Sequence, residues 1–268
     1  MKKIHQSAHS TVYLDGDTVI KVNKELIKEG DIHKEQKIFS VLSKENIIYP
    51  EILSYDLNKK EVIYRYCEGI NLKVLYGESL LKNNVDEKIL SILNEVAKAL
   101  SIIHQNRGDT NNIIDITRFS SFNKNDGHKN SKLPIVLTHG DFTLGNIIVN
   151  ENQVIILDAN SNSYINTNNG SSTIYYDLGQ FIASLDCIFP LKYHILQKKN
   201  VRKIYVSKFI EYYESLSGQE LDHSLLNNYI LVHLRAYASL KKKEKHITSI
   251  IWDNILKKKI SEVTHKNG

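Results

Sequence analysis

The chain has 268 residues, of which 41% are hydrophobic and 9% aromatic, and it carries a formal net charge of +5. A chain of this length and composition can bury a core without disulfide or metal cross-links, which excludes a wholly disordered protein. Its two cysteines, Cys67 and Cys187, are too few for a disulfide framework and favour a reducing compartment. The sequence has no apolar run of about 18 residues, which excludes a transmembrane helix, and no signal-peptide pattern at its start. We therefore expect a cytoplasmic protein.

The basic excess lies at the C-terminal end of the chain. Residues 235–268 contain nine Lys or Arg against three Asp or Glu, a local charge of +6, and the other 234 residues sum to −1. Only five of the 35 basic residues are Arg, the side chain that reads phosphates and bases in bidentate fashion. We therefore expect no nucleic-acid partner, and we expect the lysines at 241–245 and 257–259 to lie on solvent-exposed helix faces.

The first part of the chain has the pattern of β-strands around one helix. Short β-branched runs flank Asp15-Gly16, a dipeptide that is typical of tight hairpin turns. Apolar residues at helical spacing predict a helix over 25–43. The predicted strands are 11–14, 18–22, 52–57 and 61–66.

From Gly69 onward the pattern is mostly helical. Residues 85–106 place apolar side chains three and four apart, which predicts one long helix with a buried face. The polar segments 107–132 and 159–173 predict loops. Between the loops lie two predicted strands, 146–149 and 154–157, and the remaining predicted helices are 175–188, 200–217, 222–243 and 247–261. This order predicts an α+β fold with a β-rich lobe over residues 1–67 and a mostly helical lobe over 68–268.

The most informative motif is H-x-D-x4-N, formed by His139, Asp141 and Asn146 just before a strand. Asp158 follows at the end of the next strand. Phosphoryl transfer needs one carboxylate that orients the attacking hydroxyl and accepts its proton. It also needs an Asn and a second carboxylate to hold Mg²⁺, which prefers such oxygen ligands, against the nucleotide phosphates. The structural alternatives are an Asx-rich turn for Asp141 and Asn146 and a strand-end turn for Asp158.

Lys21 gives the first lobe a matching feature. It lies in the middle of the run TVIKV, which is similar to the V-A-I-K strand of kinases. Glu35 lies on the helix that follows, where it could pair with Lys21, and Glu29 on the same helix is the alternative partner. The structural alternative for Lys21 is a solvent-facing lysine.

Together these residues resemble the aminoglycoside phosphotransferase/choline kinase family, over about residues 7–240. The likeness is sharpest at 138–158, where the chain matches the family's H-G-D-x4-N pattern and its later aspartate. Gly140, in place of an Arg, favours this family over protein kinases. Two further family positions are matched by His104, at the end of a helix, and by Asp177 in the run YDLG.

The resemblance implies a protein-kinase-like bilobal fold and an enzyme that uses ATP and Mg²⁺ to phosphorylate a hydroxyl of a small molecule. Asp141 would orient that hydroxyl, and Asn146 and Asp158 would bind Mg²⁺. Lys21 and Glu35 would form an ion pair at the nucleotide phosphates.

The resemblance also implies three further nucleotide contacts in the first lobe. Ser10 would lie in the phosphate loop, and backbone groups from Arg65 to Cys67 would receive the adenine. The loop 6–11 departs from the family because it has no glycine, although its backbone N–H groups and hydroxyls could still hold phosphate. Ala159 stands where the family commonly has an aromatic residue.

Other polar residues have structural interpretations. We expect His139 to brace the loop and His104 to be a hydrogen-bonded core histidine. Asp177 is expected to cap a helix that begins near Leu178, and it could also support the catalytic loop. Cys67 and Cys187 are expected to be inert small hydrophobic residues.

Two other functions are alternatives to the small-molecule kinase. One is a protein kinase, which the missing A-P-E-like element after residues 158–174 argues against. The other is a catalytically inactive nucleotide-binding scaffold, which the glycine-free loop would favour.

The sequence leaves the acceptor and the oligomeric state open. An aminoglycoside would need an acidic pocket, choline would need an aromatic cage, and a neutral sugar needs neither. The candidate acids are Glu211, Glu214, Glu220 and Asp222. The candidate cage residues include Tyr193, Tyr205, Tyr212, Tyr213, Tyr229 and Tyr237.

Overall fold

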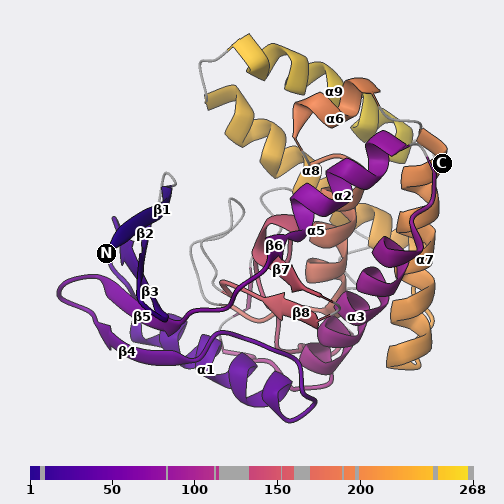
Figure 1. Cartoon of the computed structure of the whole chain (residues 1–268). Helices are drawn as coiled ribbons and strands as arrows, with labels where there is room; N and C mark the ends of the chain where they lie inside the picture. Colours follow the sequence, from indigo (N-terminus) through magenta and orange to yellow (C-terminus); the bar gives the residue numbers. More distant parts are fainter. Residues whose placement is uncertain are drawn as a thin grey trace.

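The structure is a computed structural model that describes residues 1–6, 10–82, 84–111, 113–114, 133–151, 153–159, 170–188, 190–196, 199–243 and 247–264. Figure 1 shows a small part, made of an N-terminal sheet and one helix, beside a larger and mostly helical part. This arrangement confirms the predicted α+β class. The division of the chain between residues 67 and 68 stays a prediction.

Five antiparallel strands form the N-terminal sheet, in the order β1-β2-β3-β5-β4. The strands are β1 (Lys2–Gln6), β2 (Ser10–Asp15), β3 (Thr18–Asn23), β4 (Ile52–Asp56) and β5 (Glu61–Arg65). Four of them match the predicted strands. β1 was not predicted, because all of its residues are exposed at the sheet edge, where no apolar alternation is needed.

Helix α1 (Glu29–Ser43) begins later than the predicted start at residue 25. It buries Ile38 and Leu42, and both belong to the continuous hydrophobic core of the larger part. Just after the helix, the carbonyl oxygen of Ile48 accepts a hydrogen bond from the N–H of Ile156 at 3.0 Å. The end of α1 is therefore attached to the larger part of the molecule.

A second sheet of three strands carries the candidate site. Its strands, in spatial order, are β6 (Ile70–Asn71), β7 (Ile147–Asn150) and β8 (Gln153–Ile156). The register pairs Ile147 with Ile156, and just beyond that pair the N–H of Leu157 donates to the carbonyl oxygen of Asn146 at 2.8 Å. The hairpin therefore brings Asn146 next to Asp158.

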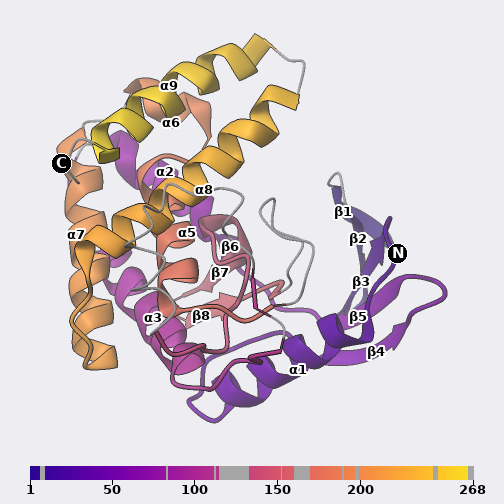
Figure 2. The same ribbon diagram turned by 180° about the vertical axis from the view of Figure 1, so that it is seen from behind.

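Helices form the rest of the larger part, and most of their bounds lie within a few residues of the predicted ones. They are α2 (Leu72–Lys82), α3 (Glu87–His104), α5 (Ile174–Asp186), α6 (Leu191–Leu196), α7 (Lys199–Ser217), α8 (His223–Lys243) and α9 (Ile247–Thr264). All of α5 from Ile174 to Leu185 is buried, because it packs between α7 and α8. Figure 2 shows the C-terminal pair α8–α9 on the side away from α1. In the ranges that the structure describes, no helix is both long enough and apolar enough to span a membrane.

One expectation for the C-terminal lysines is wrong. Lys258 is exposed, but the side chain of Lys259 is only 16% exposed and forms an ion pair with Asp186 at the end of α5. Asp186 also pairs with Arg202 of α7, at 3.1 Å. Lys259 is therefore an anchor of α9 to the core, because it shares the largely shielded carboxylate of Asp186 with the buried Arg202. Most of the predicted loops 107–132 and 159–173 lies outside the described residues.

Candidate active site

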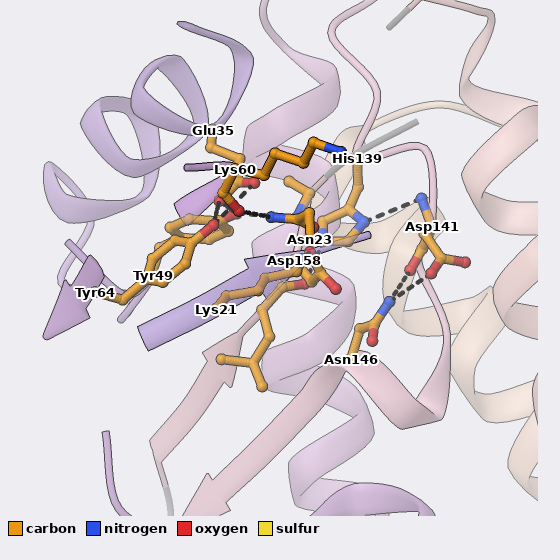
Figure 3. A network of polar contacts seen from close by, with 12 residues as sticks. Lys21, Asn23, Glu35, Tyr49, Lys60, Tyr64, His139, Asp141, Asn146 and Asp158 are labelled. Atoms are coloured by element: carbon orange, nitrogen blue, oxygen red, sulfur yellow. Dashed lines mark hydrogen bonds and ion pairs between the residues drawn. The ribbon is translucent and has the colours of Figure 1, made fainter. Parts of the chain in front are cut away.

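His139 connects the two segments that carry the candidate aspartates. Its Nε2 lies 2.9 Å from the carbonyl oxygen of Leu157, and its Nδ1 lies 3.2 Å from the backbone nitrogen of Asp141. A carbonyl can only accept and a backbone N–H can only donate, so Nε2 carries the proton and Nδ1 accepts. Burial lowers the pKa of His139 to about 4, which keeps the ring neutral. The predicted bracing role of His139 is confirmed (Figure 3).

One face of α5 holds the backbone of this loop. The carboxylate of Asp177 accepts the N–H of His139 at 2.7 Å and that of Gly140 at 2.9 Å. One turn later, Oε1 of Gln180 accepts the N–H of Phe142 at 2.9 Å. The hydroxyl of Ser184 then accepts the N–H of Leu144 at 3.3 Å. Residues 177, 180 and 184 lie on one helix face, so the helix fixes the loop as a unit.

Asp177 is inside a helix and does not cap one, so the capping prediction is wrong. Helix α5 begins at Ile174 with Thr173 at its N-cap, which places Asp177 in the first turn. Burial acts to raise the pKa of Asp177, but the hydrogen bond from His104 and the nearby His139 hold it below its usual value. The other nitrogen of His104 lies 2.8 Å from the hydroxyl of Tyr213, which confirms His104 as a hydrogen-bonded core histidine.

The carboxylate of Asp141 is held from two sides. Nε2 of Gln180 donates to one oxygen at 3.0 Å, and Nδ2 of Asn146 donates to the other at 2.8 Å. Burial raises the pKa of Asp141 to about 7, and the negative charge of Asp158 makes the second-largest contribution to this rise. A carboxylate with this pKa can exist as a base at neutral pH and can also take up a proton there.

Asn146 and Asp158 present oxygen atoms that suit Mg²⁺. The Nδ2 of Asn146 donates to both the backbone oxygen and the carboxylate of Asp141, so its amide oxygen faces away from Asp141 (Figure 3). Asp158 lies beside it, two residues after the end of β8, and has a φ of +58°, a left-handed conformation that costs a non-glycine residue about 1 kcal/mol. Such strain is typical of functional sites. One amide oxygen and one carboxylate fit the way Mg²⁺ is held beside nucleotide phosphates.

Lys21 reaches this site from the N-terminal sheet, but its partner differs from the predicted one. Its ammonium forms an ion pair with Asp158, and it is not paired with Glu35. Burial acts to lower the pKa of Lys21, and the charges of Asp158 and Glu35 outweigh it and raise that pKa. The ion pair between Lys21 and Glu35 is thus a wrong prediction, because the carboxylate of Glu35 is already held by other donors.

Two tyrosine hydroxyls hold Glu35. That of Tyr49 lies 3.1 Å from Oε2, and that of Tyr64 lies 3.1 Å from the same oxygen and 3.3 Å from Oε1. Burial raises the pKa of Glu35 to about 7, with the charge of Lys21 opposing it. Glu35 is buried on α1 and Glu29 is exposed, so Glu35 is the glutamate of this helix that faces inward, as predicted.

The three further nucleotide candidates lie along the first lobe. Ser10 is buried at the start of β2. The side chain of Arg65 turns to Glu51, to which it donates two bonds at 3.1 and 3.0 Å. The N–H of Arg65 donates to the carbonyl of Glu51 and that of Tyr66 to the carbonyl of Asp17. Of the backbone N–H groups at 65–67, that of Cys67 has no acceptor in the part of the chain that the structure describes.

Four residues of the site were not predicted: Tyr49, Tyr64, Gln180 and Ser184. The last two have a sequence signal, because polar residues recur at 177, 180 and 184 in an otherwise apolar helix. Tyr49 and Tyr64 have none, because a tyrosine before or within a strand is common for packing reasons alone.

The candidate acceptor residues are mostly occupied elsewhere. Glu211 pairs with Lys208, and the carboxylates of Glu214 and Asp222 accept backbone N–H groups at helix ends. The tyrosines at 193, 205, 213 and 229 are core residues, at most 3% exposed. Glu214 and Asp222 both lie near Tyr175, whose side chain lines a pocket with Glu220, while the buried tyrosines form no open aromatic cage.

No family model and no curated protein matches the sequence, but solved structures share its fold. A choline/ethanolamine kinase family protein from Mesorhizobium loti has a TM-score of 0.61 and 10% identity, with 98% of this chain and 87% of that chain covered. Choline kinase LicA from Streptococcus pneumoniae has a TM-score of 0.59 and 11% identity, with 97% and 92% covered. The streptomycin–ATP complex of APH(2")-IIa has a TM-score of 0.54 and 13% identity, with 90% and 84% covered. The chain has the bilobal kinase-like fold that the resemblance implied.

Proposed function

We propose that this chain is a Mg²⁺-requiring kinase that transfers the γ-phosphate of ATP to a hydroxyl of a small molecule. One observation carries the proposal: Lys21 of the N-terminal sheet is paired with Asp158, beside the bonded pair Asp141 and Asn146. A cation, two carboxylates and an amide in this arrangement are what phosphoryl transfer requires.

Asp141 acts on the acceptor. Its ionised carboxylate accepts the hydroxyl proton while the hydroxyl oxygen forms a bond to the γ-phosphorus and the bond from that phosphorus to the bridging oxygen of ADP breaks. Gln180 and Asn146 each bind one carboxylate oxygen, and they hold the base in a fixed direction.

The nucleotide lies between the lobes in this proposal. Asn146 and Asp158 hold Mg²⁺, which, when bound, neutralises charge on the phosphates. Lys21 contacts the α- and β-phosphates, Ser10 lies beside the phosphate chain, and the N–H of Cys67 donates to the adenine. These functions of Lys21, Ser10 and Cys67 follow from the family resemblance and from their position on the first lobe.

The acceptor is a small molecule with a free hydroxyl. The fold neighbours are described as choline, ethanolamine and aminoglycoside kinases, and these compounds and neutral sugars are the candidates. The carboxylates of Glu211, Glu214 and Asp222 already bind Lys208 or backbone N–H groups. This favours an acceptor that needs no acidic pocket. The use of ATP and the two free cysteines agree with a cytoplasmic reaction.

The test is phosphate transfer with a panel of these acceptors, measured as ADP release and as the phosphorylated product. We expect Asp141→Asn to lower turnover about 10³-fold while ATP binding is retained. The control is Asp56→Asn, an exposed aspartate that should leave turnover unchanged. Undiminished turnover in Asp141→Asn would refute the assignment. Transfer to protein side chains alone would favour a protein kinase, and ATP binding without any transfer would favour a scaffold.

A further inference from the structure

Tyr49 lies in the connection between α1 and β4, and its hydroxyl joins two parts of the site. The hydroxyl lies 3.1 Å from a carboxylate oxygen of Glu35 and 2.9 Å from the backbone nitrogen of Ala159. The side chain is only 3% exposed, so water does not compete for these bonds. Ala159 directly follows Asp158, so Tyr49 links helix α1 to the candidate metal ligand. Figure 3 shows Tyr49 beside Glu35.

The direction of each bond is fixed by the partners. The N–H of Ala159 can only donate, so the oxygen of Tyr49 accepts from it and the phenolic proton goes to Glu35. Burial raises the pKa of Tyr49 well above its usual value, which keeps that proton on the ring oxygen. Both bonds can therefore form at the same time.

The bond to Ala159 acts on the backbone of Asp158. The N–H of Ala159 belongs to the peptide plane that follows Asp158, so fixing it fixes ψ of Asp158. On the other side, Leu157 is fixed by His139 and by Asn146. Asp158 is thus held at both flanking peptides in its left-handed conformation, with φ at +58°.

We propose that Tyr49 is a positioning residue that holds Asp158 in the conformation that binds the metal–nucleotide complex and couples it to Glu35 on α1. This rests on the proposed function. Outer hydrogen bonds that orient a metal ligand typically change metal affinity or activity about 10- to 100-fold when they are removed.

The chain offers a matched pair of variants. Tyr49→Phe and Tyr64→Phe each keep the ring, buried in the first case and partly buried in the second, and each remove one hydroxyl from Glu35. Only Tyr49→Phe also removes the acceptor of the Ala159 N–H. We expect Tyr49→Phe to raise the Mg²⁺ concentration for half-maximal ATP binding about 10-fold, measured by calorimetry. Tyr64→Phe should change it less than about 3-fold.

Hydrogen exchange of the Ala159 amide gives a second readout that needs neither metal nor nucleotide. It should be slow in the wild type and in Tyr64→Phe, and fast in Tyr49→Phe. Equal Mg²⁺ dependence or equal Ala159 exchange in the two variants would overturn the positioning role of Tyr49. Absence of Mg²⁺-dependent ATP binding in the wild type would instead refute the proposed function, and the exchange rates would still decide whether Tyr49 fixes the backbone at Asp158.

Discussion

The carboxylate of Asp177 accepts the backbone N–H of His139 at 2.7 Å, and this bond joins helix α5 to the loop that carries Asp141. The same carboxylate accepts the N–H of Gly140 and is completely buried. Because no water can take its place, the geometry of the loop depends on a residue that lies outside it.

We expect Asp177→Asn to reduce both stability and turnover. The amide can accept only one of the two backbone N–H groups, and the other is left buried without an acceptor. Such a loss costs about 1–3 kcal/mol of the free energy of unfolding, which urea unfolding measures. The control is Asp56→Asn, since Asp56 also accepts two backbone N–H groups but in an exposed turn. Equal losses in both variants would contradict the importance of burial at Asp177.

The rate should depend on pH through Asp141. Burial raises the pKa of this carboxyl to about 7, and it must be ionised to accept the hydroxyl proton. We therefore expect kcat/KM for the acceptor to fall about tenfold per pH unit below pH 7 and to level off above it. The measurement is a pH profile at constant ionic strength, with the residual activity of Asp141→Asn as the control. A wild-type profile without this acid limb would exclude Asp141 as the base.

The catalytic segment could be predicted from the sequence because its geometry is local. The β7–β8 hairpin fixes the spacing between Asn146 and Asp158, since its register places residue 146 opposite residue 157. The same holds for most strands and helices, whose apolar periodicity reports directly on burial. β1 could not be found in this way, because an exposed edge strand has no such periodicity.

The partners of the charged residues could not be predicted, because they depend on contacts across the lobes. Nothing in the sequence distinguishes Tyr49 from a core tyrosine, although its hydroxyl contacts Ala159, 110 positions away. Likewise, Lys21 lies near both Glu35 and Asp158, and which carboxylate it contacts depends on the two hydroxyls that already hold Glu35. Sequence patterns give the residue types of such a site, and the tertiary arrangement selects the pairs.

Lys34 should be a source of instability. It lies on α1, is 8% exposed, and its ammonium has no hydrogen-bond partner among the residues that the structure describes. Burial lowers its pKa from the usual 10.5 to about 8, although Asp177 and Asp31 oppose this shift. In the folded state the lysine therefore binds its proton more weakly than in the unfolded state. This difference destabilises the folded state, and the destabilisation has its full size below pH 8.

We expect Lys34→Met to raise the free energy of unfolding at pH 7 by about 3 kcal/mol. The gain should shrink between pH 8 and about 10.5, because over that range the wild type loses the buried charge and becomes more stable. Urea unfolding at several pH values measures it. Lys37→Met, at an exposed position of the same helix, should change stability by less than about 0.5 kcal/mol. A gain that is independent of pH would show that the charge of Lys34 is not its cause.

Two glycines near Asp141 should respond differently to substitution. Gly140 has a φ of +90°, where an L-residue is strained, so we expect Gly140→Ala to cost about 1–2 kcal/mol and to displace Asp141. A Cβ at Gly145 would meet only Thr143 Oγ1 at 3.6 Å, an ordinary contact, so Gly145→Ala should change stability by less than about 0.5 kcal/mol. Thermal unfolding and turnover of the two variants test this. The same result for both would mean that backbone conformation at Gly140 does not limit the site.

The attachment of α1 to the larger part has a mechanical consequence. Ile38, Leu42, Ile47 and Tyr49 belong to the continuous core of that part, and Ile48 bridges to Ile155 of β8. We therefore expect α1 and residues 44–49 to move with the helical part as one rigid body when the five-stranded sheet moves on nucleotide binding. The hinges then lie where the chain enters and leaves the five-stranded sheet. Among the described residues, Tyr64 and Lys21 carry side-chain bonds that must exchange as the sheet moves.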